Sequence, residues 1–176
     1  MAEKEIYIVI SQTGTILSRI LKIITRDEYN HASISPYGDL SRMYSFGRKH
    51  PYNPFWGGFV VESKDFGTFK RFHKTKAQVL AIPVEEEQYR NLCRKLELMA
   101  TNRKKYHYNY MGLCLAVFRI HRTWKNRFYC SEFVREMLRQ QQIEGVEALP
   151  SIIHPVHFLA LPKAKTVYCG QLKDYC

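Results

Sequence analysis

The chain has 176 residues, of which 45% are hydrophobic and 14% aromatic, and its formal net charge is +11. This length and apolar content predict one compact domain over residues 1–176 and exclude a disordered chain. The longest apolar runs are far shorter than the roughly 18 residues of a membrane span, so we expect no stable membrane insertion. The excess of basic residues favours acidic partners: nucleic acid, anionic lipid, or an acidic small molecule or peptide.

The first half of the chain predicts strands joined by turns, with a single helix. Apolar periodicity predicts a helix over residues 15–24 and strands over 5–11, 31–35, 40–46, 59–62 and 79–84. A short turn with a proline and a glycine separates the second and third strands, so we expect these two to pair as a hairpin. Residues 47–58 hold two prolines and two adjacent glycines, which predicts a loop. That loop is either a lid over a site or a packed surface loop.

The second half predicts three helices and a last strand. Three consecutive glutamates begin the first helix at Glu85, and its apolar stripe consists of Tyr89, Leu92, Leu96 and Met99. Residues 110–118 predict a buried helix, 130–142 an amphipathic helix, 150–162 an irregular segment and 165–169 a terminal strand. Together these patterns predict an α+β fold with a mainly antiparallel sheet packed against helices.

Residues 128–134, Phe-Tyr-Cys-Ser-Glu-Phe-Val, place a cysteine at the predicted start of the amphipathic helix. The apolar stripe of this helix begins with Cys130 and continues through Phe133, Val134, Met137 and Leu138. The sulfur would then lie beside unpaired backbone N–H groups at the positive end of the helix dipole, which favours the thiolate. A buried structural cysteine is the alternative interpretation.

A cysteine nucleophile needs a general base, and the chain offers seven histidines. His31 is the best placed, because it opens a predicted strand and shares one face of that strand with Ser33 and Ser35. The start of a strand is rigid yet accessible, which suits a base held in one rotamer. The alternative is a partly exposed strand histidine without a catalytic role.

Other kinds of site have weaker signals. His154 and His157 are the only close pair of this type, and no cysteine pair stands nearby at zinc-finger spacing, so we predict no metal. Phosphate-binding glycine loops and serine nucleophile motifs are missing from the sequence, and we predict no cofactor. Basic stretches alternate with aromatic residues at 70–74, 103–108 and 121–125. We interpret them as solvated faces rather than a nucleic-acid site, because the sequence has no signature of a nucleic-acid module.

The five cysteines lie at irregular spacings, at positions 93, 114, 130, 169 and 176. An odd number without paired spacing does not predict a disulfide framework. The residues after Met1 lead directly into a strand pattern and lack the features of a signal peptide. We therefore expect a reducing, cytoplasmic compartment. The sequence leaves the oligomeric state open.

Five short blocks occur in a fixed order along the chain, at residues 29–34, 43–49, 57–62, 128–134 and 152–158. Taken together they resemble the circularly permuted papain-like cysteine hydrolases, specifically the YiiX/YebB-like group of the NlpC-type superfamily. The histidine precedes the cysteine in this permuted group, whereas ordinary papain-like enzymes have the opposite order. The block around Cys130 is the most specific of the five, and the blocks span nearly the whole chain.

The resemblance implies a permuted papain-like fold in which Cys130 is the nucleophile and His31 the base. A third polar residue, often glutamate, orients the imidazole in this group, and here Ser45 and Glu62 are both candidates. The implied activity is that of an amidase or peptidase that transfers an acyl group from an amide or ester to the thiolate. Two alternatives remain: a catalytically inactive ligand-binding module, and a lipid acyltransferase or esterase at an anionic membrane surface.

Overall fold

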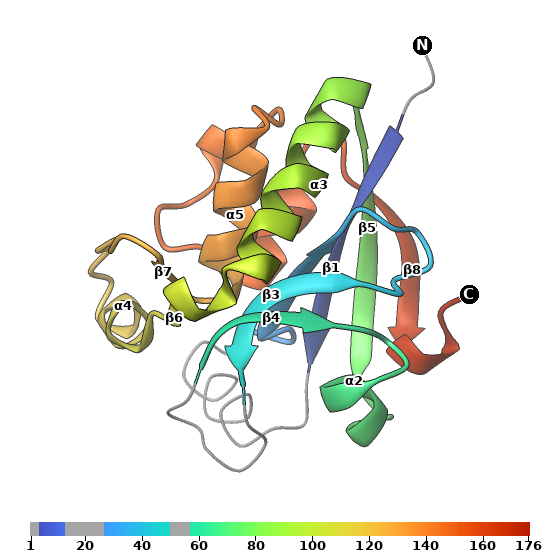
Figure 1. Cartoon of the computed structure of the whole chain (residues 1–176), viewed down its shortest axis with the longest axis horizontal. Helices are drawn as coiled ribbons and strands as arrows, with labels where there is room; N and C mark the ends of the chain where they lie inside the picture. Colours follow the sequence, from blue (N-terminus) through green and yellow to red (C-terminus); the bar gives the residue numbers. More distant parts are fainter. Residues whose placement is uncertain (1–3, 13–26, 50–56) are drawn as a thin grey trace.

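The computed structural model describes residues 4–12, 27–49 and 57–176. Its centre is an eight-stranded sheet in the order β7-β6-β4-β3-β2-β1-β5-β8 (Figure 1). The strands are β1 Lys4–Gln12, β2 His31–Ser35, β3 Met43–Arg48, β4 Gly57–Glu62, β5 Lys76–Val84, β6 His107–Tyr108, β7 Arg127–Phe128 and β8 Lys165–Gln171. Every pairing is antiparallel except that of β6 with β7. The predicted α+β class and mainly antiparallel sheet are therefore confirmed.

The α-helices in the described part of the chain are α2 Gly67–Arg71, α3 Glu86–Thr101, α4 Tyr110–Val117 and α5 Cys130–Gln140. Short 3-10 turns lie at η1 Arg103–Lys105, η2 Val146–Ala148, η3 Pro155–Ala160 and η4 Leu172–Asp174. The predicted helices at 85, 110 and 130 are confirmed to within a few residues, whereas α2 was not predicted. The helix predicted over residues 15–24 lies outside the described residues.

The predicted hairpin of the second and third strands forms, with Ile34 opposite Tyr44. The later strand begins at Met43 rather than Leu40, because Leu40 adopts a left-handed φ of 54° and its N–H closes a turn onto Tyr37. The predicted loop at 47–58 is shorter than expected, since its first two and last two residues belong to β3 and β4. Residues 50–56, which carry its prolines, lie outside the described residues.

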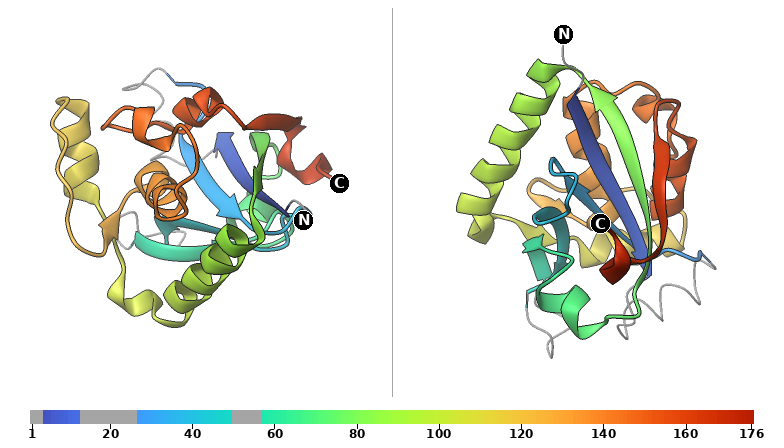
Figure 2. Two further views of the ribbon diagram at one scale, coloured as in Figure 1. Left: turned by 90° about the horizontal axis from the view of Figure 1, so that it is seen from above. Right: turned by 90° about the vertical axis from the view of Figure 1, so that its right-hand side faces the viewer.

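Both faces of the central strands β1, β2 and β5 are buried, so these strands carry apolar residues on each side. The larger core lies between the sheet and helices α3 and α5, which pack on the same face (Figures 1 and 2). A smaller core on the other face contains Val9, Met43, Val79, Phe69 of α2 and Leu172 of η4. Residues of β1 alternate between the two cores, as the period of two requires.

A cluster of aromatic rings fixes α5 against β3 and β4. The Phe133 ring lies 5.1 Å from that of Phe46 and 5.6 Å from that of Phe59, measured between centroids, and all three side chains are fully buried. Edge-to-face contacts of this kind add to the burial of apolar area. The contact anchors the first turn of α5, and with it Cys130, to the centre of the sheet.

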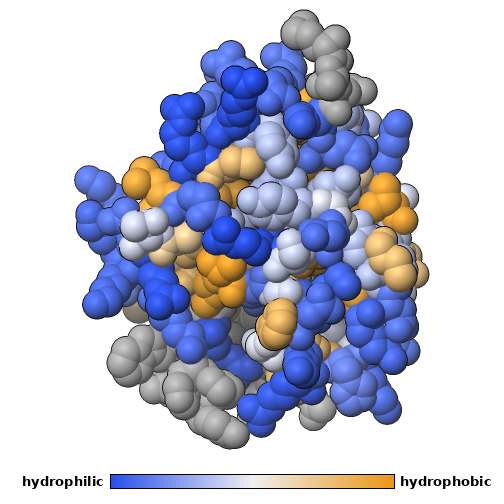
Figure 3. Space-filling view, turned by 45° about the vertical axis from the view of Figure 1, so that its right-hand side comes forward, coloured by the Kyte–Doolittle hydropathy of each residue, from blue (hydrophilic) through white to orange (hydrophobic). Residues whose placement is uncertain are grey.

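The outer surface is mainly polar. Figure 3 shows one face covered by hydrophilic residues, with hydrophobic residues in small separate patches. Within residues 4–12, 27–49 and 57–176, the helices are too short or too polar to cross a bilayer. The expectation of a buried helix at 110–118 is wrong, because Met111 is 62% exposed and Phe118, directly after α4, is 75% exposed.

Candidate active site

Cys130 is the first residue of α5, as predicted. The residue is 6% exposed, and its Sγ lies 3.9 Å from the carbonyl oxygen of Asn30, the residue before β2. The backbone N–H groups of the first helical turn lack acceptors within the helix, and Cys130 belongs to that turn. The thiol is therefore both buried and placed at a helix start, so the two interpretations of the sequence are compatible.

His31, on β2, lies against Glu62, on β4. The His31 Nε2 is 3.0 Å from the Glu62 Oε2, and each side chain is 13% exposed. Ser33, two residues along β2, donates from Oγ to the same carboxylate oxygen at 2.8 Å and lies 3.3 Å from Nε2. Cys130 is close enough to the same imidazole to contribute to raising the pKa of His31. The structure thus brings Cys130, His31 and Glu62 together.

The charged forms of His31 and Glu62 stabilise each other. Burial lowers the pKa of His31, but attraction to Glu62 and hydrogen bonds with Cys130 and Glu62 outweigh burial and raise the pKa to about 10. Burial raises the pKa of Glu62, but the His31 charge and hydrogen bonds from His31 and Ser33 bring it below its usual range. At neutral pH the pair is therefore an imidazolium and a carboxylate.

One ring nitrogen of His31 is engaged, because Nε2 lies 3.0 Å from the Glu62 carboxylate, and this leaves Nδ1 for another partner. Gly47 of β3 lies beside the pair, since a Cβ there would be in ordinary van der Waals contact with His31 Cε1 at 3.9 Å and with Glu62 Oε1 at 4.0 Å.

Ser45, the other candidate for the third position, lies elsewhere. Its Oγ donates to the carbonyl oxygen of Ala32 at 2.6 Å and is fully buried. That bond uses the single proton of the hydroxyl to join β3 to β2, away from the imidazole. Of the two candidates, the structure therefore puts Glu62, and not Ser45, on the His31 ring. Ser33, which the sequence placed on the His31 face, is the serine that contacts it.

Two polar residues that follow Cys130 fasten the start of α5 to its neighbours. Ser131 donates from Oγ to the carbonyl oxygen of Ile153 at 2.7 Å. Glu132 accepts hydrogen bonds of 3.2 Å from the N–H of Tyr129 and from the side-chain amide of Asn109. Asn109 in turn caps α4 by accepting from the N–H of Gly112 at 2.9 Å.

Sequence reasoning missed the supporting roles of Glu132 and Asn109. The available signal was the three-residue spacing from Tyr129 to Glu132, which is the spacing of a capping glutamate. Burial raises the pKa of Glu132, whereas its bonds to Asn109 and Tyr129 counteract that rise in part.

Ser131→Ala is expected to lower the free energy of unfolding by about 1–3 kcal/mol, because the buried Ile153 carbonyl loses its donor. Chemical denaturation of the full chain measures this change. Ser151→Ala, at an exposed position in the same region, is the matched control and should stay within about 0.5 kcal/mol of wild type. Equal effects of the two substitutions would contradict the role given to the Ser131 hydrogen bond.

A cavity of about 420 Å³ opens beside the Cys130 sulfur. Tyrosines and apolar residues form most of its wall, with polar groups at a few positions: Tyr29, Tyr108, Tyr129, Leu113, Ala116, Ile152, Ile153, Pro155, Asn30, Ser131, Asp27, His154 and Arg119. The His154 Nδ1 lies 2.5 Å from the Asp27 Oδ2 in this wall. A mostly apolar cavity with a few polar groups is the usual form of a small-molecule site.

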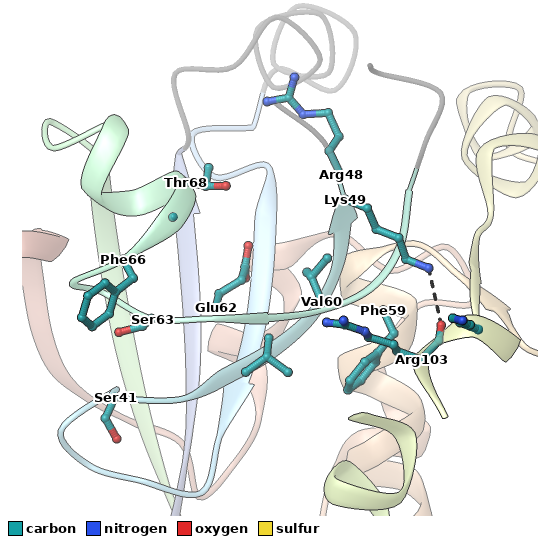
Figure 4. Close-up of a pocket in the computed structure, with 13 residues that line it drawn as sticks. Ser41, Arg48, Lys49, Phe59, Val60, Glu62, Ser63, Phe66, Thr68 and Arg103 are labelled. Carbon is teal, nitrogen blue, oxygen red and sulfur yellow. Dashed lines mark hydrogen bonds between the residues drawn. The ribbon is translucent and has the colours of Figure 1, made fainter. Parts of the chain in front are cut away.

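A second pocket, of about 590 Å³, is drawn in Figure 4. Its lining includes Glu62 and the basic residues Arg48, Lys49, Arg103 and Lys104. Figure 4 shows the Lys49 ammonium directed at the Arg103 carbonyl, to which it donates at 3.4 Å. Cys130 lines the first cavity and Glu62 the second, so the 420 Å³ cavity is the one that reaches Cys130.

The part of the chain that the structure describes holds no cluster of three His, Cys, Asp or Glu side chains suited to a metal ion. No protein-family model matches the chain, and no curated protein is similar enough in sequence to count as a match. The resemblance to the permuted papain-like hydrolases therefore stays a prediction, and the functional argument depends on the geometry around Cys130.

Proposed function

We propose that this chain is a cysteine hydrolase that cleaves an amide or ester by acyl transfer, with a circularly permuted papain-like fold of the YiiX/YebB-like group. One observation carries the proposal: Cys130, at a helix start, lies beside His31 closely enough to raise its pKa, and the His31 Nε2 lies 3.0 Å from the Glu62 carboxylate. A nucleophile, a base and a group that orients the base are the parts that thiol acyl transfer needs.

The first half-reaction forms a thioester. The Cys130 thiolate attacks the substrate carbonyl carbon, and the N–H groups of the first turn of α5 stabilise the oxyanion that develops. His31, as imidazolium, donates its Nδ1 proton to the leaving nitrogen or oxygen as the carbon–heteroatom bond breaks. The amine or alcohol departs and the acyl group stays on the sulfur.

The second half-reaction releases the acid. Neutral His31 takes a proton from water, the hydroxide attacks the thioester carbon, and the carbon–sulfur bond breaks to give the carboxylic acid and the thiolate. Glu62 retains its negative charge throughout and stabilises the imidazolium in both steps. Ser33 holds the Glu62 oxygen in place through its 2.8 Å hydrogen bond.

A lipid-linked ester is the second candidate substrate, and the apolar wall of the cavity favours it, because Leu113, Ala116 and Ile152 suit an acyl chain. If the chain is instead a catalytically inactive ligand-binding module, Cys130 should react as an ordinary thiol.

For the compartment we expect the cytoplasm, because the five free cysteines are odd in number and irregularly spaced.

Alkylation with iodoacetamide at about pH 6.5, followed by peptide mass mapping, tests the proposal, since ordinary thiols of pKa about 8.5 are only about 1% ionised there. We expect Cys130 to be modified fastest of the five cysteines, although it is 6% exposed and Cys114, Cys169 and Cys176 are exposed. The exposed cysteines are internal controls. If the cysteines are modified in the order of their solvent exposure, with Cys130 slowest, the proposal is wrong and the inactive module is favoured.

A further inference from the structure

Helix α4 is apolar on two sides. Leu113 and Ala116 line the cavity beside Cys130, while Met111 and Phe118 project into solvent with 62% and 75% of their surface exposed. Ile120, just beyond the helix, is 51% exposed. The helix contains no charged residue. A helix with apolar residues on both sides is normally covered, so we expect a binding partner to cover the exposed residues Met111, Phe118 and Ile120.

The chain around α4 has an extreme charge pattern. Residues 98–131 contain seven Lys and Arg and no Asp or Glu. All seven cations are exposed, and none of them forms an ion pair with a carboxylate of the described residues: Arg103, Lys104, Lys105, Arg119, Arg122, Lys125 and Arg127. Such a stretch attracts an anionic surface.

Figures 1 and 2 show α4 at the periphery of the molecule, beyond the short strands β6 and β7. The segment after α4 adds Trp124, whose ring is covered by the Arg122 guanidinium at 5.5 Å. Exposed apolar side chains, flanking cations and an indole ring together are typical of protein segments that lie in the interface of a bilayer.

We propose that Met111, Phe118, Ile120 and the seven cations of residues 98–131, the α4 surface, bind peripherally to an anionic lipid bilayer. The apolar side chains enter the boundary between headgroups and acyl chains, and the cations contact lipid phosphates. A nucleic acid fits less well, because Met111 and Ile120 gain nothing from base stacking. Docking in this way brings the cavity beside Cys130 to the membrane surface.

Co-sedimentation of the full chain with vesicles tests the docking surface. We expect binding to vesicles of phosphatidylcholine with about one quarter phosphatidylglycerol, and weak binding to phosphatidylcholine alone, since each cation near an anionic surface contributes about a fivefold gain in partitioning. Raising the salt concentration weakens the binding by screening. Absence of binding to the anionic vesicles at low salt overturns the proposal.

Two variants and their controls separate the α4 surface from general basicity. Phe118→Ser should weaken partitioning roughly tenfold, and the pair Arg122→Gln with Lys125→Gln about 25-fold. The controls lie outside the docking surface and should keep vesicle partitioning within about twofold of wild type. One is Phe66→Ser, at a phenylalanine that is 69% exposed, and the other is the pair Lys76→Gln with Lys165→Gln, at exposed strand positions. Equal losses in variants and controls overturn the proposal, provided that circular dichroism shows all of them folded.

Two further measurements complete the test. Cys130→Ala should bind vesicles like wild type, so that a failure of docking and a failure of the cysteine chemistry are told apart. A polyuridine RNA is the competing ligand. If the RNA binds as tightly as the anionic vesicles and Phe118→Ser leaves both affinities unchanged, the surface is a polyanion site and the bilayer assignment is wrong.

Discussion

Glu62→Gln is expected to slow the alkylation of Cys130 at about pH 6.5 by about 10- to 100-fold, because the thiolate loses its imidazolium partner. Glu62 is the main group that raises the pKa of His31 against the opposing effect of burial. Glutamine retains the shape but not the charge, so burial then lowers the pKa of the imidazole and keeps it neutral. The rate constant of iodoacetamide modification of Cys130, measured between about pH 5 and 9, checks this expectation.

Two serines on neighbouring strands give matched controls. Ser33→Ala removes the 2.8 Å hydrogen bond to the Glu62 carboxylate and should produce a smaller loss, of about 3- to 10-fold, because the Glu62 charge stays beside the imidazole and only one of its hydrogen bonds is lost. Ser45→Ala removes a bond to the Ala32 carbonyl and should leave the reactivity of Cys130 unchanged. Wild-type reactivity of Cys130 in Glu62→Gln would show that Glu62 is not the group that orients His31. A loss in Ser45→Ala as large as the loss in Glu62→Gln would show the same.

Local periodicity was sufficient to place the two central residues. The stripe that begins at Cys130 fixed the start of α5, and the alternation around His31 fixed a strand with Ser33 on the same face. Both patterns depend on contacts within one element, so a single sequence reveals them. The choice between Ser45 and Glu62 depends on which neighbouring strand carries a side chain to the imidazole.

That choice could not be made from sequence because it depends on tertiary geometry. Ser45 is next to β2 in the sheet, yet its hydroxyl is used by the Ala32 carbonyl. Glu62 is one strand further away, yet its Oε2 reaches the imidazole and lies 3.0 Å from Nε2. Periodicity gives the face of a strand but not the reach of a side chain along it.

The cavity beside Cys130 could not be predicted from sequence either, because it also depends on tertiary geometry. Its lining runs from Asp27 to Pro155, and its Asp27–His154 pair links positions 127 apart in sequence. The exposure of α4 was also missed, because an uncharged stretch of eight residues resembles a buried helix when only its composition is read. Whether a helix of this composition is covered depends on what packs against it.

The His31–Glu62 pair should also give the free energy of unfolding a characteristic pH dependence. The pKa of His31 rises from 6.5 to about 10 on folding, so its contribution is complete below about pH 6.5 and is lost as the pH rises toward 10. The pKa of Glu62 falls below 4.5 on folding, so its contribution is complete above about pH 4.5 and is lost on further acidification. The pair therefore stabilises most between about pH 4.5 and 6.5.

In Glu62→Gln the slope between about pH 5 and 8 should reverse, because the charge that does most to raise the pKa of His31 is lost, so that burial outweighs the contribution of Cys130 and protonation opposes folding. Urea denaturation across this range should show stability that rises with pH in the variant and falls with pH in wild type. Near pH 5.5 the loss should be about 3–5 kcal/mol, as for other broken buried pairs. Glu144→Gln, which breaks an exposed pair with Lys163, should cost less than about 1 kcal/mol without changing the slope. A Glu62→Gln profile parallel to that of wild type would mean that His31 is not charged in the folded protein.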